Sequence, residues 1–166
     1  MNDTETLWPV LPNAVEEATR RLLDKACERE LTLATAESCT GGMLASLLTD
    51  VQGVAHAFDR GFVTYSEESK TEMLGVPAGL IAEKSAVSRE VAVAMAEGAL
   101  TRSSANIAVA VTGFADKGRE PGLVHFACAR AGRKTAHREE HFGPIGRGAT
   151  RVECMRVAVE MMTEML

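Results

Sequence analysis

Hydrophobic and polar residues alternate along this chain with two periods, one typical of helices and one of strands. After Asn13, a residue suited to cap a helix, apolar residues recur at helical spacing: Val15, Ala18, Leu22 and Ala26. Residues 31–36 form a short apolar and β-branched run that predicts a strand. Gly41 and Gly42 then open an apolar-faced segment over 43–48 that predicts a helix. The chain therefore begins as helix, strand, helix.

The middle of the chain repeats this alternation. Residues 58–65 predict a strand, and Ser66 is placed to cap a helix that runs to residue 74. Ser88 is placed to cap an alanine-rich helix ending at residue 100. Residues 107–111 are nearly all apolar, as expected for a strand that is covered on both faces.

Two successive strands and a helix complete the pattern. The strands are predicted over 123–131 and 135–142, joined near Gly132, and the helix carries one apolar stripe: Val152, Met155, Val159, Met162 and Leu166. Alternating helices and strands followed by a hairpin predict an α/β fold, a three-layer α/β/α sandwich with a mixed sheet. We predict a single domain over residues 1–166, with an irregular lead-in at 1–12.

Charge and cysteine usage narrow the classes of function. The net charge of −5 argues against a nucleic-acid binder but leaves anionic small molecules as ligands. The four cysteines are widely scattered, which favours reduced thiols over disulfides or a zinc site. The polar, acidic residues 1–6 are no secretory signal, and no apolar run is long enough to span a bilayer. We therefore expect a soluble cytoplasmic protein with neither a nucleic-acid nor a membrane partner.

The first candidate for chemistry is Ser38, which stands between a predicted strand and the Gly41-Gly42 helix start. Glycines there let the backbone approach a ligand, and the free N–H groups of a first helical turn bind anions. A serine beside such donors is placed to attack a carbonyl whose oxyanion they stabilise. On local pattern alone, Ser38 or Thr40 acting only as a helix cap is the commoner arrangement.

A serine nucleophile needs a base, and Lys70 is one candidate. None of the four histidines has a spacing that marks it as a triad member. Lys70 lies in the first turns of the helix that follows Tyr65, where the helix dipole and burial would lower its pKa, although Glu67 and Glu68 would oppose that shift. The alternative is a solvated surface lysine.

Two further places suit a ligand. Thr112-Gly113 follows an apolar strand, a junction at which α/β proteins bind ligands. Arg147 and Arg151 stand four residues apart near the start of the last helix, so they share one face and suit a phosphate or a carboxylate. A solvated arginine pair is the alternative.

The order of these motifs resembles the CinA C-terminal domain family, from about residue 22 to the end. The resemblance is carried by Ala36-Glu37-Ser38-Cys39-Thr40-Gly41-Gly42, Arg60-Gly61-Phe62-Val63-Thr64-Tyr65-Ser66 with Lys70 and Leu74-Gly75-Val76, Ala86-Val87-Ser88, and Val111-Thr112-Gly113. Characterised members are nicotinamide mononucleotide deamidases that release ammonia, leave nicotinate mononucleotide and need no metal. Longer members carry an additional N-terminal domain, so this chain resembles the stand-alone form.

The resemblance implies roles for individual residues. Ser38 would be the nucleophile, Lys70 its base and Tyr65 an assisting group. The substrate-binding residues would be Glu37, Thr40, Gly41, Gly42, Thr112, Gly113, Arg147 and Arg151, with the two arginines near the phosphate. It further implies a small-molecule nucleotide substrate, no cofactor, no metal, and a homodimer or higher homo-oligomer.

One loop departs from the family pattern. After Val-Thr-Gly the family continues as a glycine- and proline-rich loop, whereas here Asp116 replaces a glycine and Lys117 a proline. The following Pro121-Gly122-Leu123-Val124 is one residue shorter than usual. This departure keeps two other functions open: a catalytically weak relative that binds a nucleotide or a protein partner, and a hydrolase of another amide.

Overall fold

The computed structural model describes residues 11–166. The elements are, in chain order, α1 Asn13–Glu28, β1 Leu33–Glu37, α2 Met43–Thr49, the 3-10 turn η1 Ala55–Ala57, β2 Phe58–Val63, α3 Glu67–Leu74, α4 Ala78–Lys84, α5 Arg89–Thr101, β3 Ile107–Gly113, β4 Leu123–Arg130, β5 Ala136–His141 and α6 Arg147–Met165. The predicted elements are all present, apart from shifts of a few residues at their ends. The lead-in predicted for 1–12 lies outside the described residues, except for its last two.

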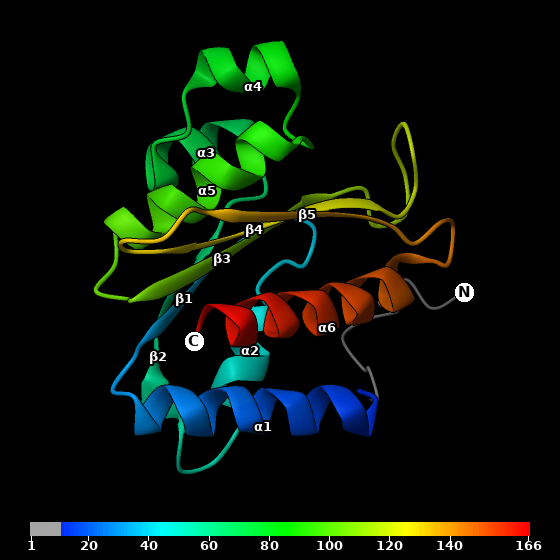
Figure 1. Cartoon of the computed structure of the whole chain (residues 1–166). Coiled ribbons are helices and arrows are strands. Elements are labelled where there is room, and N and C mark those ends of the chain that lie inside the picture. Colours follow the sequence, from blue (N-terminus) through cyan, green and yellow to red (C-terminus); the bar gives the residue numbers. More distant parts are fainter. Residues whose placement is uncertain (1–10) are drawn as a thin grey trace.

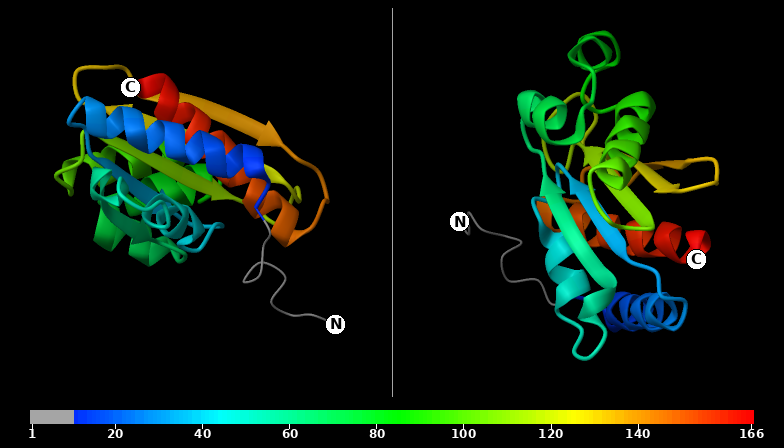
Figure 2. Two further views of the ribbon diagram at one scale, coloured as in Figure 1. Left: turned by 90° about the horizontal axis from the view of Figure 1, so that it is seen from below. Right: turned by 90° about the vertical axis from the view of Figure 1, so that its left-hand side faces the viewer.

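The five strands form one mixed sheet in the order β2-β1-β3-β4-β5. β2 and β3 are both parallel to β1, and the β3-β4-β5 meander is antiparallel. Helices α3, α4 and α5 lie on one side of the sheet, and α2 and α6 lie on the other, with α1 packed against α6 (Figures 1 and 2). The predicted α/β sandwich with a mixed sheet is confirmed.

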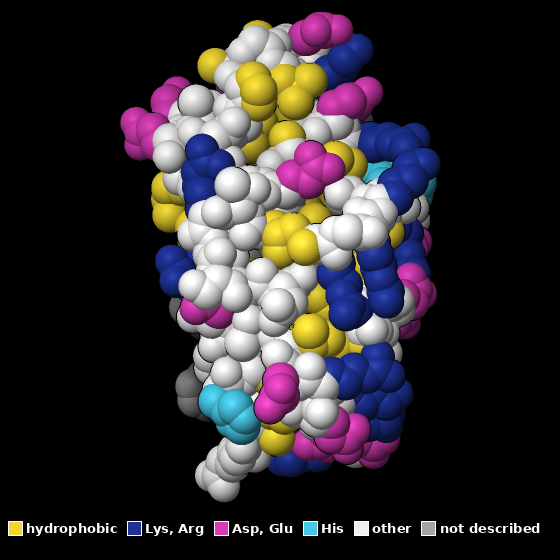
Figure 3. Space-filling model, turned by 60° about the vertical axis from the view of Figure 1, so that its left-hand side comes forward, with side chains coloured by type: hydrophobic (Ala, Val, Ile, Leu, Met, Phe, Trp, Pro, Cys, Tyr) yellow, Lys and Arg dark blue, Asp and Glu magenta, His cyan; other side chains and the backbone are white. Residues whose placement is uncertain are grey.

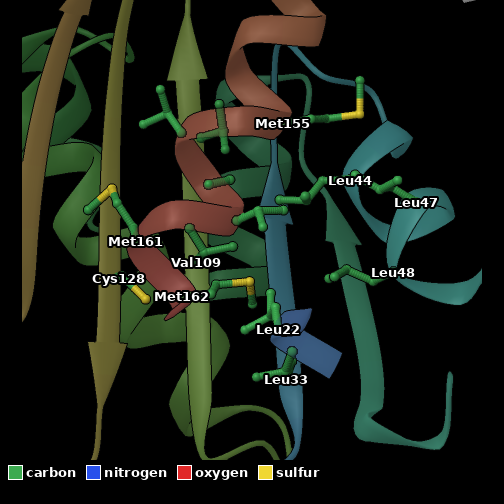
Figure 4. Packing of buried hydrophobic residues seen from close by; sticks show 14 of the residues in the cluster. Leu22, Leu33, Leu44, Leu47, Leu48, Val109, Cys128, Met155, Met161 and Met162 are labelled. Carbon is green, nitrogen blue, oxygen red and sulfur yellow. The ribbon is translucent and has the colours of Figure 1, made fainter. Parts of the chain in front are cut away.

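The two faces of the sheet carry residues of different size. On the α6 side, larger residues such as Leu33 and Val109 pack against Leu22, Met155 and Met162 (Figure 4). On the α5 side, the strands contribute six alanines: Ala34, Ala36, Ala108, Ala110, Ala127 and Ala129. Successive strand residues point to opposite faces of the sheet. The alternation of large and small residues therefore produces a thick core on the α6 side and a close helix contact on the α5 side.

Helix α4 and the short 3-10 turn η1 are the elements among the described residues that the pattern analysis did not predict. Helix α4 is the larger of the two. It is seven residues long, follows Pro77, and buries only Ile81 among its side chains. Helix α2 is equally short but shows an apolar face of three buried leucines, whereas the single buried side chain of α4 gives no helical period. Packing of α4 on α3 and α5 supplies the stability that its own sequence lacks.

The surface mixes charges of both signs. On the face shown in Figure 3, Lys and Arg side chains gather along one side, although the chain is acidic overall. A negative net charge is therefore compatible with local cationic regions. Within residues 11–166, no helix is both long and apolar enough to cross a membrane.

Candidate active site

Ser38 lies directly after β1, at the carboxyl end of the parallel part of the sheet. Its side chain is largely buried, and its backbone N–H donates to the carbonyl of Val111 on β3, at 3.0 Å. The turn that follows uses Gly41 at φ 60° and Gly42 at φ 95°. These left-handed conformations explain the two glycines, because side chains with a Cβ rarely adopt them.

Lys70 reaches this turn from α3. Ser66 caps that helix, since its hydroxyl accepts from the N–H of Ser69 at 3.1 Å. The Nζ atom of Lys70 lies 3.0 Å from Ser38 Oγ and donates to the carbonyl of Thr64 at 2.7 Å. The lysine predicted as a base is therefore in direct contact with the serine predicted as a nucleophile.

Lys70 is also one of the largest fully buried side chains among residues 11–166, with only 1% of its surface exposed. Burial lowers the pKa of its ammonium group, against opposing effects of Cys39 and Glu67. The opposition anticipated from Glu67 is present, but desolvation outweighs it. A lysine of this kind is more easily held in its neutral, proton-accepting form than a surface lysine is.

A pocket of about 300 Å³ opens over the serine–lysine pair. Its apolar lining comes from Cys39, Ala86, Val87, Phe114 and Ala115. Its polar lining comes from Ser38, Tyr65, Lys70, Thr112, Gly113, Asp116, Lys117, Arg147 and Arg151. The pocket thus combines a nucleophile and a base with an apolar wall and three cationic side chains, an arrangement suited to an anionic ligand with a flat apolar part.

The two arginines enter the pocket from the first turns of α6. Arg151 Nε donates to the carbonyl of Cys39 at 2.8 Å, which ties α6 to the Ser38 turn. Arg147 Nη2 lies 3.5 Å from Asp116 Oδ2, and both side chains are nearly half exposed. The loop that departs from the family pattern therefore contacts the proposed anion-binding region.

Thr112 and Gly113 line the pocket as predicted, and the Thr112 hydroxyl donates to the carbonyl of Ala86 at 2.8 Å. Tyr65 also lines it, but with 70% of its surface exposed it stands at the rim. Tyr65 makes no hydrogen bond to Ser38 or Lys70 within residues 11–166.

Four of the residues assigned to substrate binding lie differently. Glu37, Thr40, Gly41 and Gly42 belong to the wall behind Ser38 and are not part of the pocket lining. The Glu37 carboxylate is fully buried and accepts hydrogen bonds from the amides of Gly42, Leu44 and Ala45 at the start of α2. The helix start that was expected to hold the substrate is thus occupied by the chain's own carboxylate.

Several pocket residues escaped the pattern analysis. Ala86 and Val87 stand in a stretch quoted for the resemblance, but nothing about small apolar residues indicates that they face a ligand. The Thr64 carbonyl, which holds Lys70, is a backbone group and gives no signal in the sequence. Asp116 and Lys117 did give one, because they depart from the family loop.

The fold and the site together define an α/β sandwich protein with a buried serine–lysine pair at the strand ends. The CinA C-terminal domain family matches residues 15–166, and the chain belongs to this family. A crystal structure of a competence/damage inducible protein from Agrobacterium tumefaciens superimposes with a TM-score of 0.90 at 42% identity, covering 95% of this chain and 98% of that one. A CinA superfamily protein from Escherichia coli gives a TM-score of 0.84 at 31% identity, covering 100% and 94%.

Curated relatives are similar over a shorter part of their own length. The CinA-like protein of Geobacter sulfurreducens is 48% identical over 72% of this chain and 30% of its own. The CinA-like protein of Akkermansia muciniphila is 44% identical over 76% of this chain and 32% of its own. The chain therefore spans about a third of the length of these relatives.

Proposed function

We propose that this domain hydrolyses the carboxamide of nicotinamide mononucleotide to nicotinate mononucleotide and ammonia. The observation that carries the proposal is the contact of 3.0 Å between the buried Lys70 Nζ and Ser38 Oγ beneath a pocket with cationic side chains. The family resemblance points to the same reaction. The contact supplies the nucleophile and base, and the cations supply a place for the phosphate.

The reaction would proceed through an acyl-enzyme. Neutral Lys70 takes the proton of Ser38 as Oγ forms a bond to the carboxamide carbon, and the carbonyl oxygen becomes an oxyanion. The Lys70 ammonium then donates its proton to the amide nitrogen, the C–N bond breaks and ammonia leaves. Water attacks the resulting ester, Lys70 accepts its proton, and return of that proton to Ser38 releases nicotinate mononucleotide. The Thr64 carbonyl keeps Nζ oriented throughout.

The oxyanion needs hydrogen-bond donors within the Ser38 turn. The Ser38 amide is taken by Val111, the Gly41 amide by Ser38 and the Gly42 amide by Glu37. The Thr40 amide has no partner within residues 11–166, but Thr40 does not line the pocket. The Cys39 amide has no partner there either, and Cys39 does line the pocket. We assign the oxyanion to this N–H; losing one such donor typically costs about 100- to 1000-fold in turnover.

The pocket supports a mononucleotide as the substrate. Val87, Phe114 and Ala115 offer an apolar wall for a pyridine ring, while Arg147, Arg151 and Lys117 can pair with a phosphate. A volume of about 300 Å³ is at the small end of ligand pockets, which favours one nucleotide over a dinucleotide.

A second candidate function is binding without efficient hydrolysis. It is favoured by one observation, the ion pair between Asp116 and Arg147, which occupies a cation that the phosphate would otherwise use. A third candidate, hydrolysis of another amide, keeps Ser38 and Lys70 and differs only in the pocket wall.

Ammonia release from a substrate panel separates these functions. The panel holds nicotinamide mononucleotide, nicotinamide riboside, nicotinamide, the dinucleotide and an amino-acid amide, each with and without a chelator. We expect equimolar ammonia and nicotinate mononucleotide, no effect of the chelator, and at least about tenfold weaker use of the riboside, since each lost charge-assisted contact costs about 1.5–3 kcal/mol. Binding of the mononucleotide without ammonia would favour the second function, and ammonia only from non-pyridine amides the third.

A further inference from the structure

We infer that Glu37 is a positioning residue that holds the Ser38 turn and the Lys70 amine in reactive register, and not a substrate ligand. The inference rests on the proposed serine–lysine chemistry and assigns Glu37 a separate part in it. Three observations support it: the contacts of the Glu37 carboxylate, its backbone link to Lys70, and its place next to Ser38.

The carboxylate of Glu37 is fully buried, and both of its oxygens are in use. Oε2 accepts from the amides of Gly42 at 3.1 Å and Leu44 at 3.0 Å. Oε1 accepts from the amide of Ala45 at 2.8 Å and from the hydroxyl of Thr35 at 3.2 Å. The N–H and O–H donors compensate the burial of this carboxylate, so Glu37 joins the end of β1 to the start of α2 across the Ser38 turn.

The backbone of Glu37 extends this link to the base. Its carbonyl accepts from the amide of Thr64 at 2.8 Å, and the Thr64 carbonyl accepts from Lys70 Nζ at 2.7 Å. Lys70 Nζ in turn contacts Ser38 Oγ, which belongs to the residue next to Glu37. The chain of contacts therefore closes on itself, and one residue fixes both partners of the serine–lysine pair.

Replacement of Glu37 by glutamine tests this role with almost no change in size. Whichever way the amide is oriented, its NH₂ group would face at least one backbone N–H, either Ala45 or the pair of Gly42 and Leu44. Two donors cannot bond to each other, so the turn must move. A displacement of about 1 Å between reacting groups can cost about 100-fold in rate.

The experiment measures how fast a fluorophosphonate probe labels Ser38, since this rate reports nucleophile and base without any nucleotide. We expect Glu37→Gln to label at least about tenfold more slowly than wild type, well below its unfolding temperature. With nicotinamide mononucleotide we expect the loss in kcat, with KM within about threefold of wild type. Leu22→Ala is the control for a general loss of stability, because it destabilises the core at a place remote from the pocket. This variant should label at the wild-type rate.

The outcomes separate the inference from the proposed function. Wild-type labelling at Ser38 together with equally fast labelling of Glu37→Gln would overturn the inference alone. Absence of Ser38 labelling in the wild type would overturn the proposed function and the inference with it. If Glu37→Gln fails to fold, Thr35→Val is the deciding variant, because it removes one hydrogen-bond donor to the Glu37 carboxylate and leaves that carboxylate in place. A severalfold slower rate supports the inference, and an unchanged rate contradicts it.

Discussion

Burial of Lys70 costs stability and favours the role of base that we propose for it. Lys70 is buried almost completely, yet its amine has only a backbone carbonyl and a serine hydroxyl as close polar partners among the described residues. An ammonium group in such a place is poorly compensated, which is why burial lowers its pKa. In the proposed mechanism, the same property makes its neutral, proton-accepting form easier to reach than that of a surface lysine.

The first prediction concerns the pH dependence of catalysis. If the neutral form of Lys70 is the base, as proposed, kcat/KM should rise with pH and level off above an apparent pKa below the unperturbed lysine value of about 10.4. Lys70→Arg keeps the charge but cannot deprotonate, so it should be nearly inactive across that range. Lys117→Arg is the matched control: Lys117 lines the pocket as a cation, so replacement by another cation should preserve activity. An active Lys70→Arg would rule out the lysine as base.

The second prediction concerns Asp116, the carboxylate in the altered loop. Asp116→Gly removes a negative charge from the pocket and releases Arg147, so KM for nicotinamide mononucleotide should fall about 5- to 30-fold at low salt, or roughly 1–2 kcal/mol. The gain should shrink at high salt, where charges are screened. Asp116→Asn removes the negative charge without the added backbone freedom of glycine, so it shows which of the two changes alters KM. A KM that is the same as wild type at both salt concentrations would show that the loop does not act on the substrate.

At the level of single residues, the sequence predicted the candidate serine–lysine pair better than the contacts that support it. Ser38 and Lys70 could be singled out because each stands at a junction with its own local signal, the glycine pair and the capping serine. The family resemblance then favoured nucleophile and base over a helix cap and a surface lysine. Their contact could not be derived from spacing, since it depends on how α3 packs over β1. Glu37 was placed with the substrate because a sequence cannot show that a carboxylate folds back onto the amides of its own helix.

Among the elements, α3 matters most because it carries Lys70. Its end packs against Gly98 of α5, where an added Cβ would lie within 2.1 Å of the Leu74 carbonyl oxygen. The alanines on this side of the sheet allow α5 to lie close, so no slack is available to absorb the added atom.

The third prediction follows from this contact. Helix propensity alone would make Gly98→Ala stabilising by about 1 kcal/mol, but overpacking against a backbone carbonyl costs more. We expect a net loss of about 1–3 kcal/mol in the free energy of unfolding and a lower kcat, because α3 must shift. Gly79→Ala on α4 has nothing within 4 Å and should keep or slightly raise stability. A stabilised, fully active Gly98→Ala would contradict the packing argument.

The order of elements was predictable because helix and strand periods differ, and the strand over 107–111 was recognisable as buried on both faces. The neighbours of each strand were not predictable to the same degree. Pairing of β1 between β2 and β3 brings Ser38, Thr64 and Val111 together, and it depends on contacts distant in sequence.

For the whole molecule, the buried lysine links stability to pH. The folded-state pKa of Lys70 is lowered, so between that value and the unfolded value of about 10.4 the unfolded chain binds more protons. The cost in folding free energy of burying the Lys70 ammonium is therefore present at low pH and is relieved as pH rises through this window. Chemical denaturation of wild type and Lys70→Met at pH 7 and pH 9.5 should show the wild type gaining relative to the variant. A constant or reversed difference would contradict a lowered pKa.

Assembly remains a prediction at this scale. The family resemblance implies a homodimer or higher homo-oligomer with a nucleotide as its small-molecule ligand, and the molar mass in solution tests the first part.

The most direct test of the account is turnover of nicotinamide mononucleotide by Ser38→Ala beside the wild-type protein. Loss of an essential nucleophile removes several orders of magnitude in kcat while leaving the fold intact. We predict that wild type forms equal amounts of ammonia and nicotinate mononucleotide, that the variant forms neither at a measurable rate, and that both unfold at similar temperatures. Near-wild-type turnover by Ser38→Ala would mean that Ser38 is only part of a turn, and the serine–lysine mechanism would be wrong.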